Sequence, residues 1–436
     1  MTTPQQTDHQ QRGNPSTSRG WAATGLLAVA PLGLLGVVLW GIAVLKPLDR
    51  MRGEDFPPVE ELTVVRTVLP EPGLIELHLV NGGPDPVTVA QVLVDEAYWS
   101  FWMDAGHGLT NDPALEELLP DDRAQELERR RTIGRLGRAV IWLEYPWVQG
   151  EAHEVVLISK TGVTFGTTIE VAVVSPTATA RYFGLFALLG VLVGLIPVYL
   201  GLMWYPLIRR LGERTINVLL CFTVGLLVFL AIDAVSEALE ASTQLPEVYQ
   251  GPALIVLGLV GTMLLLLAAG GWMQESATRR GPGFESLGLA YFIALGIGLH
   301  NLGEGLAIGA AFNLGALSLG TMLIVGFTLH NITEGLAIVS PLARVGVRLT
   351  HLGWLGLLAG GPTIVGGWVG AFAYSPLWSV LFLAIGAGAI LQVVFEIFRQ
   401  MAAGEAVTRV LRPLPNLGGL AAGFGLMYAT SLLVAM

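Results

Sequence analysis

The sequence predicts an all-α polytopic membrane protein that also carries one small β-rich domain. Of 436 residues, 53% are hydrophobic and only 13% are charged, and the mean hydropathy is +0.63. A soluble enzyme is far less apolar. Long apolar runs fill the second half of the chain, and each is able to cross a bilayer core of about 30 Å. Glycine is abundant, at 55 residues, which is typical of helices packed closely in lipid.

The N-terminus is predicted to be a disordered tail followed by a transmembrane anchor. Residues 1–20 are mostly Gln, Ser, Thr, Pro and Asn, which bury too little apolar surface to offset the entropy of ordering. Residues 21–45 form an apolar run that is longer than the core of a signal peptide and lacks a clear small-residue cleavage site. We therefore expect a retained anchor whose preceding tail is cytoplasmic.

Residues 53–180 have the pattern of a β domain. Apolar and polar residues alternate at 74–80 and at 154–159, as in strands with one buried face. The stretch 163–174 is rich in β-branched residues and predicts a further strand. The charged stretch 113–138 is expected to be an exposed helical insertion. The predicted result is a small β-sandwich.

Residues 182–436 are predicted to form a bundle of eight transmembrane helices. Each helix corresponds to one apolar run that is long enough to cross the bilayer. The runs cover residues 183–207, 216–239, 253–274, 286–312, 316–340, 352–373, 376–398 and 415–435. The anchor adds one further crossing ahead of the bundle.

The loops between these helices alternate in basic content, and this predicts their orientation. Every second loop carries arginine, whereas the loops between them carry no basic residue. The basic positions are Arg209, Arg210, Arg214, Arg279, Arg280, Arg344, Arg348, Arg399, Arg409 and Arg412. By the positive-inside rule these loops are cytoplasmic. The β domain and the C-terminus are therefore expected outside the cell membrane, although Lys46, Arg50 and Arg52 after the anchor run against the rule.

Charge and cysteine content exclude several classes of function. A net charge of -10 and a pI near 5.2 argue against a nucleic-acid partner, which requires a basic face. The single cysteine, Cys221, cannot form an intrachain disulfide, a thiolate metal cage or a CxxC redox pair. Membrane lipid and a cation remain as partners.

One ten-residue segment occurs twice in the predicted helices, at an offset of 30 residues. Residues 299–308 and 329–338 are identical at eight of ten positions, and each segment contains His-Asn-x-x-Glu. Because His and Glu stand four residues apart, they lie on one face of a helix, with Asn beside that face. An ionised carboxylate at this depth costs several kcal/mol unless something compensates its charge.

Two such faces that meet between neighbouring helices would form a metal site. The donors would be His300, Glu304, His330 and Glu334. This N2O2 set suits a borderline divalent cation, with zinc as the first candidate and Fe(II), Mn(II), Co(II) and Cd(II) within reach. The alternative is that each His and Glu is a hydrogen-bonded pair that joins helices in lipid. The duplication makes this alternative the weaker interpretation.

Three further carboxylates lie inside predicted helices, with no Lys or Arg among them, and favour a pathway for cations. They are Asp233, Glu237 and Glu396. Asp233 and Glu237 are again four residues apart and would form an acidic funnel. The alternative interpretation places these carboxylates near helix ends, in contact with solvent.

At the repeated segment the chain resembles the ZIP (Zrt/Irt-like) family of divalent metal transporters. That family has eight helices, an HNxxE-type motif on the fourth and an H-N-x-P-E-G motif on the fifth. The matching residues are His300, Asn301, Glu304, His330, Asn331, Glu334 and Gly335. The resemblance covers roughly residues 182–436.

The resemblance implies a binuclear metal site in the middle of the membrane. Glu304 and Glu334 would bridge two metal ions, and Asn301 and Asn331 would complete the second position. The family resemblance also implies uptake toward the cytoplasm, by an elevator-like movement of one helix bundle against the other. No cofactor is implied beyond the transported ion.

Three features depart from the family pattern. Thr333 stands where the family usually has proline, so a milder helix break is expected. Gly361 stands where the family has glutamate, so we expect one tightly held metal ion per chain rather than two. The loop 275–285 lacks a histidine cluster, and the anchor and β domain have no counterpart in the simplest family members.

Two other functions stay open beside transport. An intramembrane metalloprotease is disfavoured because a zincin needs H-E-x-x-H, and because four protein ligands would fill the open position that catalytic zinc requires. The second rival is a receptor that senses metal and signals through the β domain. The expected protein is therefore a transporter and not an enzyme. The sequence leaves open whether the chain forms a homodimer and what the β domain binds.

Overall fold

The computed structural model describes residues 33–38, 40–41, 57–278, 282–402 and 406–435. The chain divides into two compact units, Met1–Pro58 and Val59–Met436, and every element named below belongs to the second unit. The predicted tail and most of the predicted anchor lie outside the described residues. The described anchor residues, 33–38 and 40–41, are helical.

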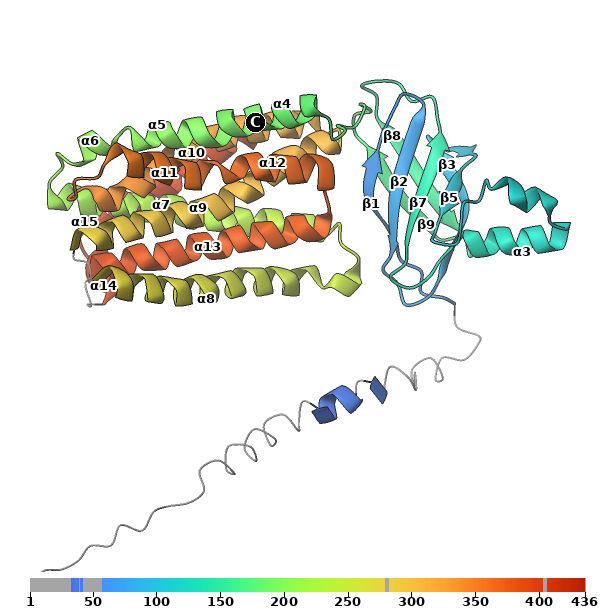
Figure 1. Ribbon diagram of the computed structural model, residues 1–436, viewed down its shortest axis with the longest axis horizontal. Coiled ribbons are helices and arrows are strands. Elements are labelled where there is room, and N and C mark those ends of the chain that lie inside the picture. The colour runs from blue at the N-terminus through green and yellow to red at the C-terminus, as the bar shows by residue number, and fades with distance from the viewer. Residues whose placement is uncertain (1–32, 39, 42–56, 279–281, 403–405, 436) are drawn as a thin grey trace, which may run out of the picture. The chain divides into compact units, whose positions relative to one another are not determined.

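Among the described residues, nine strands form a β domain of two sheets. One sheet has the order β1-β2-β7-β5, and the other has the order β4-β3-β8-β9 with β6 paired to β3 (Figure 1). The strands are β1 (Leu62–Val68), β2 (Leu74–Asn81), β3 (Val87–Val94), β4 (Ala97–Trp99), β5 (Trp102–Asp104), β6 (Thr132–Ile133), β7 (Arg138–Glu144), β8 (His153–Ser159) and β9 (Thr164–Ile169). Every pairing is antiparallel.

The two sheets enclose one hydrophobic core. The alternating residues of β2 bury Ile75, Leu77 and Leu79 in this core. From the other sheet, β8 buries Val155 and Leu157 in the same cluster. Both strands lie where the alternation in the sequence predicts them, because alternate side chains of a strand point to opposite faces.

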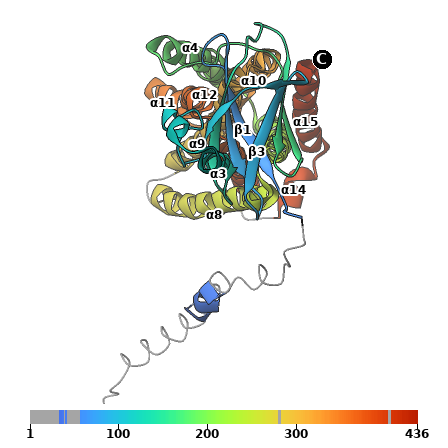
Figure 2. The same ribbon diagram turned by 90° about the vertical axis from the view of Figure 1, so that its right-hand side faces the viewer.

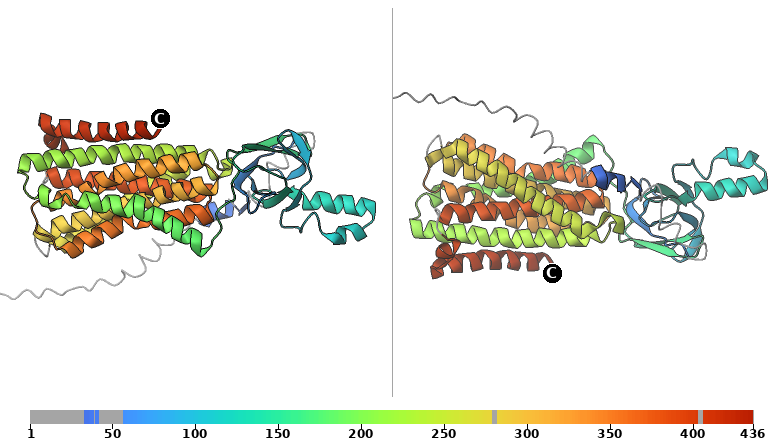
Figure 3. Two further views of the ribbon diagram at one scale, coloured as in Figure 1. Left: turned by 90° about the horizontal axis from the view of Figure 1, so that it is seen from above. Right: turned by 90° about the horizontal axis from the view of Figure 1, so that it is seen from below.

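Two predicted boundaries in the β domain differ from the structure. β9 ends at Ile169 instead of reaching 174, because the backbone N–H of Ala172 donates to the carbonyl of Glu151 (2.8 Å) and not to β8. The insertion 113–138 is helical only in its first part, as η1 (Pro113–Glu117) and α3 (Pro120–Arg130). The residues after α3 return to the sheets as β6 and β7. α3 buries no residue and extends away from the strands (Figure 3).

The remainder of the second unit is helical. Its elements are α4 (Ala180–Gly190), η2 (Val191–Leu195), α5 (Ile196–Leu202), α6 (Tyr205–Ile208), α7 (Glu213–Ser242), η3 (Glu247–Tyr249), α8 (Gly251–Thr278), α9 (Pro282–Asn313), α10 (Leu317–Val339), η4 (Ser340–Leu342), α11 (Leu349–Gly360), α12 (Pro362–Ala373), α13 (Pro376–Ala402), α14 (Val407–Leu411) and α15 (Leu414–Ala435). The long helices run side by side, with α8 and α15 at the edge of the bundle (Figures 1 and 2).

Seven stretches of the described chain are long and apolar enough to cross a membrane. They correspond to α4–α6, α7, α8, α9, α10, α11–α12 and α13. The eighth predicted segment, 415–435, is helical as α15 but is not among the seven. The prediction of a multi-pass helical membrane protein with a small β region is confirmed.

Two helices that the sequence predicts as continuous are interrupted. The first, 183–207, contains one turn of π-helix, η2. The second, 352–373, divides at Gly361 into α11 and α12, because Pro362 has no backbone N–H to continue the helix. In contrast, α10 passes through Thr333 without a break, and the Thr333 hydroxyl donates to the carbonyl of His330 (2.6 Å).

Glycines bring helix backbones into direct contact within two sets of helices. Between α9 and α12, a Cβ atom on Gly366 would lie 2.1 Å from the carbonyl oxygen of Leu302. Between α5 and α10, a Cβ atom on Gly335 would lie 2.2 Å from the carbonyl oxygen of Val198. Close contacts of the same kind join α7 to α15 at Gly423. In each case only a residue without a side chain permits the approach.

Candidate metal centre

The structure brings the two repeated segments together. His300 and Glu304 lie on α9, and His330 and Glu334 lie on α10. Only a short connection separates these helices, so they pack as antiparallel neighbours. One ligand atom from each of the four side chains lies within 4.8 Å of all the others, and all four side chains are buried. The imidazole and carboxylate pairs therefore converge on one point.

Glu304 lies at the middle of this cluster and joins both helices. Its Oε1 contacts the Nε2 of His330 and lies 3.2 Å from the Nε2 of His300. Its Oε2 accepts a hydrogen bond from the side-chain amide of Asn331 (3.2 Å). One carboxylate thus contacts both imidazoles and one of the two asparagines.

Each of the two asparagines donates a hydrogen bond to the glutamate of the other helix. Asn301 on α9 donates to the Oε2 of Glu334 on α10 (3.0 Å), whereas Asn331 on α10 donates to Glu304 on α9. Each amide also donates to a backbone carbonyl of a third element, Asn301 to Ala359 (3.1 Å) and Asn331 to Val193 (2.9 Å). The asparagines therefore hold the carboxylates in place from both sides.

The two carbonyls that receive these amides lie where helices are interrupted. Val193 belongs to the π-helix η2, and Ala359 precedes the break before Pro362. Irregular turns of this kind are frequent at functional sites. Pro362 is visible in the sequence, but the π-helix has no sequence signature, and neither carbonyl was predicted as part of the site.

Several polar atoms of the centre are buried without a hydrogen-bond partner among the described residues. They are the Nε2 of His300, the Oδ1 of Asn301, the Oδ1 of Asn331 and the Oε1 of Glu334. A buried polar group without a hydrogen bond costs about 1–3 kcal/mol. Hydrogen bonds between the helices therefore do not account for every polar atom of the centre. All four are atoms that can offer a lone pair, and no Lys or Arg side chain is buried in the described part of the chain.

The donor set fits one divalent transition-metal ion. Ligand bonds of about 2.1 Å in a tetrahedral site place the donor atoms about 3.4 Å apart. The present spread of up to 4.8 Å therefore needs only a modest contraction. Two imidazoles and two carboxylates supply neutral nitrogen and anionic oxygen, which offsets the two positive charges of the ion.

A second metal position lacks a third carboxylate. In the described residues, this is the one group of three or more His, Cys, Asp or Glu side chains that could hold an ion. Gly361, where the resemblance would place a glutamate, is the C-cap residue of α11 and contributes no side chain. The Oδ1 atoms of Asn301 and Asn331 remain as side-chain donors for a further ion.

An acidic cavity of about 230 Å³ leads to His330. It is lined by Asp233 and Glu237 of α7, by Phe327 and His330 of α10, and by Thr430 of α15. Both carboxylates that the sequence predicts as a funnel thus lie on this cavity. It opens on the side of the bundle where α7 ends and α10 begins, because Glu237 and Leu319 belong to its lining.

On the opposite side of the centre the described space is narrow. The cavity next to His330 and Glu334 on that side has only about 10 Å³, close to the minimum for a single water molecule. Leu226, Leu227 and Leu230 of α7 line it. Among the described residues, the acidic cavity is therefore the wider approach to the centre.

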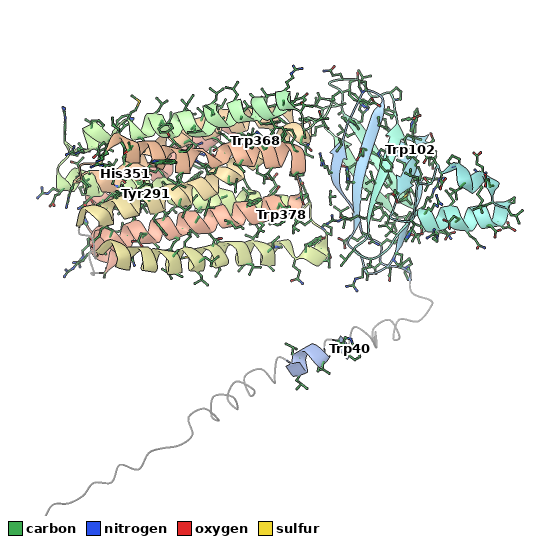
Figure 4. The ribbon with its side chains drawn as sticks, viewed as in Figure 1. Trp40, Trp102, Tyr291, His351, Trp368 and Trp378 are labelled. Carbon is green, nitrogen blue, oxygen red and sulfur yellow. The ribbon has the colours of Figure 1, made fainter. Side chains whose placement is uncertain are left out.

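The remaining predicted residues lie elsewhere. Glu396 is not part of the acidic cavity; its Oε1 accepts from the guanidinium of Arg399 (2.6 Å) near the end of α13. His351, in the first turn of α11, lies beside Tyr291, whose hydroxyl is 3.0 Å from its Nδ1 (Figure 4). Neither residue contacts the centre.

Neither a protein-family model nor a curated protein matches this chain. The resemblance to the ZIP family therefore depends on the motif residues and on the site that they form. Its consequences for function are taken up as a proposal.

Proposed function

We propose that the protein is a secondary transporter that carries a divalent transition metal, most readily zinc, into the cytoplasm. The observation that carries this proposal is the convergence of the two His and Glu pairs within 4.8 Å at a buried point. An uncompensated pair of carboxylates is costly in the hydrocarbon layer, whereas a bound M²⁺ ion offsets their charge. A ZIP-like protein uses these residues to bind its substrate ion.

The direction of transport follows from the orientation proposed for the loops. With the arginine-rich loops inside, the end of α7 and the start of α10 face outward. The acidic cavity then opens to the exterior, and the leucine-lined side of the centre faces the cytoplasm. Metal ions enter past Asp233 and Glu237, bind at the centre and leave after the leucine side opens.

The glycine contacts support a division of the bundle into two moving parts. Backbone contacts join α9 to α12 and α5 to α10 in one set, and α7 to α15 in another. We propose an elevator-like shift of the first set, which carries the centre, against the second. In this proposal α15 is the eighth crossing and residues 21–45 are the anchor.

Uptake into vesicles tests the function. Purified protein in liposomes is expected to accumulate Zn²⁺, with Mn²⁺, Fe²⁺, Co²⁺ and Cd²⁺ competing. Failure to take up any of these ions would refute transport. Metal-dependent cleavage of a membrane peptide would then favour the protease, and metal binding without uptake would favour the receptor.

One metal ion per chain is expected at saturation. Gly361 supplies no carboxylate, so the asparagine side of the centre carries too little negative charge for a second M²⁺ ion. Elemental analysis of protein equilibrated with zinc and then separated from free ion measures this ratio. Two equally occupied ions in anomalous scattering would contradict the expected count.

Removal of both funnel carboxylates, by Asp233→Asn with Glu237→Gln, is expected to raise the KM for zinc uptake about tenfold with little change in the maximal rate. The two carboxylates concentrate cations in the cavity but do not belong to the four donors of the centre, and focusing of this kind changes association by about 10-fold or more. The difference should shrink as ionic strength rises.

The matched control for this double variant is Glu213→Gln with Glu285→Gln. It removes the same charge from exposed positions at the starts of α7 and α9. An equal rise in KM in both double variants would mean that net charge, and not the cavity, sets the effect.

A further inference from the structure

A second cavity, of about 670 Å³, lies between the β domain and the helices, and we call it the vestibule. β1 and β9 line one side of it. The other side consists of the end of α7, the residues between α9 and α10, and the start of α10. Leu319 lines both the vestibule and the acidic cavity. The two spaces therefore adjoin at this residue.

Carboxylates lead from the vestibule toward the metal centre. Glu240 lines the vestibule, and on α7 it lies one turn beyond Glu237, which lines the acidic cavity. Glu170, directly after β9, adds a second carboxylate, and Arg66 of β1 is the one basic side chain in the described lining. Arg66 lies close enough to Glu76 for their charges to interact. The lining therefore has a net negative charge.

Asn313 gives an independent sign of a ligand in the vestibule. It lies in the lining, and only 2% of its surface is exposed. Its amide donates to the carbonyl of Ala371 (2.6 Å), but its Oδ1 has no partner among the described residues. An unpaired buried carbonyl oxygen is costly, and oxygen of this kind is a common ligand or water acceptor for divalent cations.

Direct contacts hold the β domain against this end of the helices. The backbone N–H of Glu247 donates to the carboxylate of Glu61, which precedes β1 (2.9 Å). Gly315, between α9 and α10, has φ +75°, and a Cβ atom there would lie 2.5 Å from the carbonyl of Val171. Only glycine suits both the conformation and the close approach. The wall of the vestibule thus contacts the connection between the two helices that carry the metal centre.

We propose that the vestibule collects hydrated divalent metal ions and delivers them to the acidic cavity, with the β domain as its outer wall. This inference rests on the proposed transport function and assigns the β domain a role in it. A volume of 670 Å³ accommodates an ion together with several waters, since each water takes roughly 30 Å³ in the liquid. Removal of the hydration shell then occurs deeper, at the centre.

A charged label on the wall of the vestibule tests the proposal. Cys221 is the only cysteine and is fully buried, so Thr168→Cys in the full-length chain offers one exposed thiol in the lining. Labelling with a trimethylammonium methanethiosulfonate is expected to raise the KM for zinc uptake about threefold to tenfold, because it repels cations. Labelling with the sulfonate analogue should leave the KM unchanged or lower it.

Thr164→Cys is the matched control. Thr164 is exposed on the same face of β9, four residues away, but does not line the vestibule, so neither label should alter its KM. If both labels leave the KM of Thr168→Cys unchanged while Glu304→Gln abolishes uptake, the vestibule is refuted and transport stands. If Glu304→Gln transports normally, the proposed function itself fails.

Glu170→Gln provides a second route that does not depend on labelling. It removes one exposed carboxylate from the lining and is expected to raise the KM about twofold to threefold. Glu116→Gln, on an exposed residue of η1 outside the vestibule, should not change it. Equal KM values for these two variants would overturn the proposal.

Discussion

Replacing Glu304 with glutamine is expected to reduce metal uptake at least about 100-fold. Glu304 is the side chain that contacts both His300 and His330 and also accepts from Asn331. Loss of a residue that only supports a ligand costs 10–100-fold in affinity, so loss of the central carboxylate should cost more. Initial rates of ⁶⁵Zn²⁺ uptake into proteoliposomes measure the effect.

The same variant should remain folded, which separates a lost ligand from a lost structure. Burial of a carboxylate is costly without a cation, so the metal-free variant is expected to melt at or above the temperature of the metal-free parent protein. Zinc should raise the melting temperature of the parent, because ligand binding stabilises the folded state, and should not raise that of Glu304→Gln. Glu213→Gln, at an exposed ion pair with Arg344, is the control for both measurements. Normal uptake by Glu304→Gln would exclude this centre as the transport site.

Much of the site could be predicted because the two motifs lie on regular helices. On a helix, His and Glu at i and i+4 must share a face, and the short connection between α9 and α10 leaves few ways for the two faces to meet. The interruption at η2 and the role of the Val193 carbonyl could not be predicted. They depend on how η2 packs against α10, and no local pattern in the sequence encodes that packing.

The same distinction applies to the fold. The strands at 74–80 and 154–159 follow from alternation alone, since one face of each is buried in the core. The stretch 163–174 is equally rich in β-branched residues, yet β9 ends at Ile169. After β9, the backbone N–H of Ala172 donates to the carbonyl of Glu151 in a loop. This contact joins segments that are distant from one another in the sequence. The residue preferences of a segment predict whether it forms a strand, whereas contacts with distant segments decide where the strand ends.

Glu396 shows what the charge pattern of the sequence cannot predict. The spacing of Asp233 and Glu237 indicates a shared face, and both residues line one cavity. Glu396 satisfies the same criteria of depth and charge but pairs with Arg399, one turn away on α13. Sequence spacing shows which carboxylates share a helix face, whereas the neighbouring helices decide which face lines a pathway.

A large loss of stability is expected from Gly366→Ala. A Cβ atom at this position would lie 2.1 Å from the carbonyl oxygen of Leu302 and 2.8 Å from the backbone nitrogen of Leu306. Neither is the end of a flexible side chain, so α9 and α12 must separate. Overpacking of this kind typically costs 1–3 kcal/mol, and occasionally more, and a lower melting temperature in detergent should report it.

The same substitution at Gly353 is expected to raise the melting temperature instead of lowering it. Nothing lies within 4 Å of a Cβ atom at Gly353, and alanine is favoured over glycine in a helix by up to about 1 kcal/mol. A higher melting temperature is therefore expected there. Because Leu302 lies between His300 and Glu304 on α9, the shift caused by Gly366→Ala should also impair zinc uptake, whereas Gly353→Ala should not. Equal melting temperatures for Gly366→Ala and Gly353→Ala would refute the backbone contact between α9 and α12. His300 and Glu304 on α9 would then not depend on that contact for their positions.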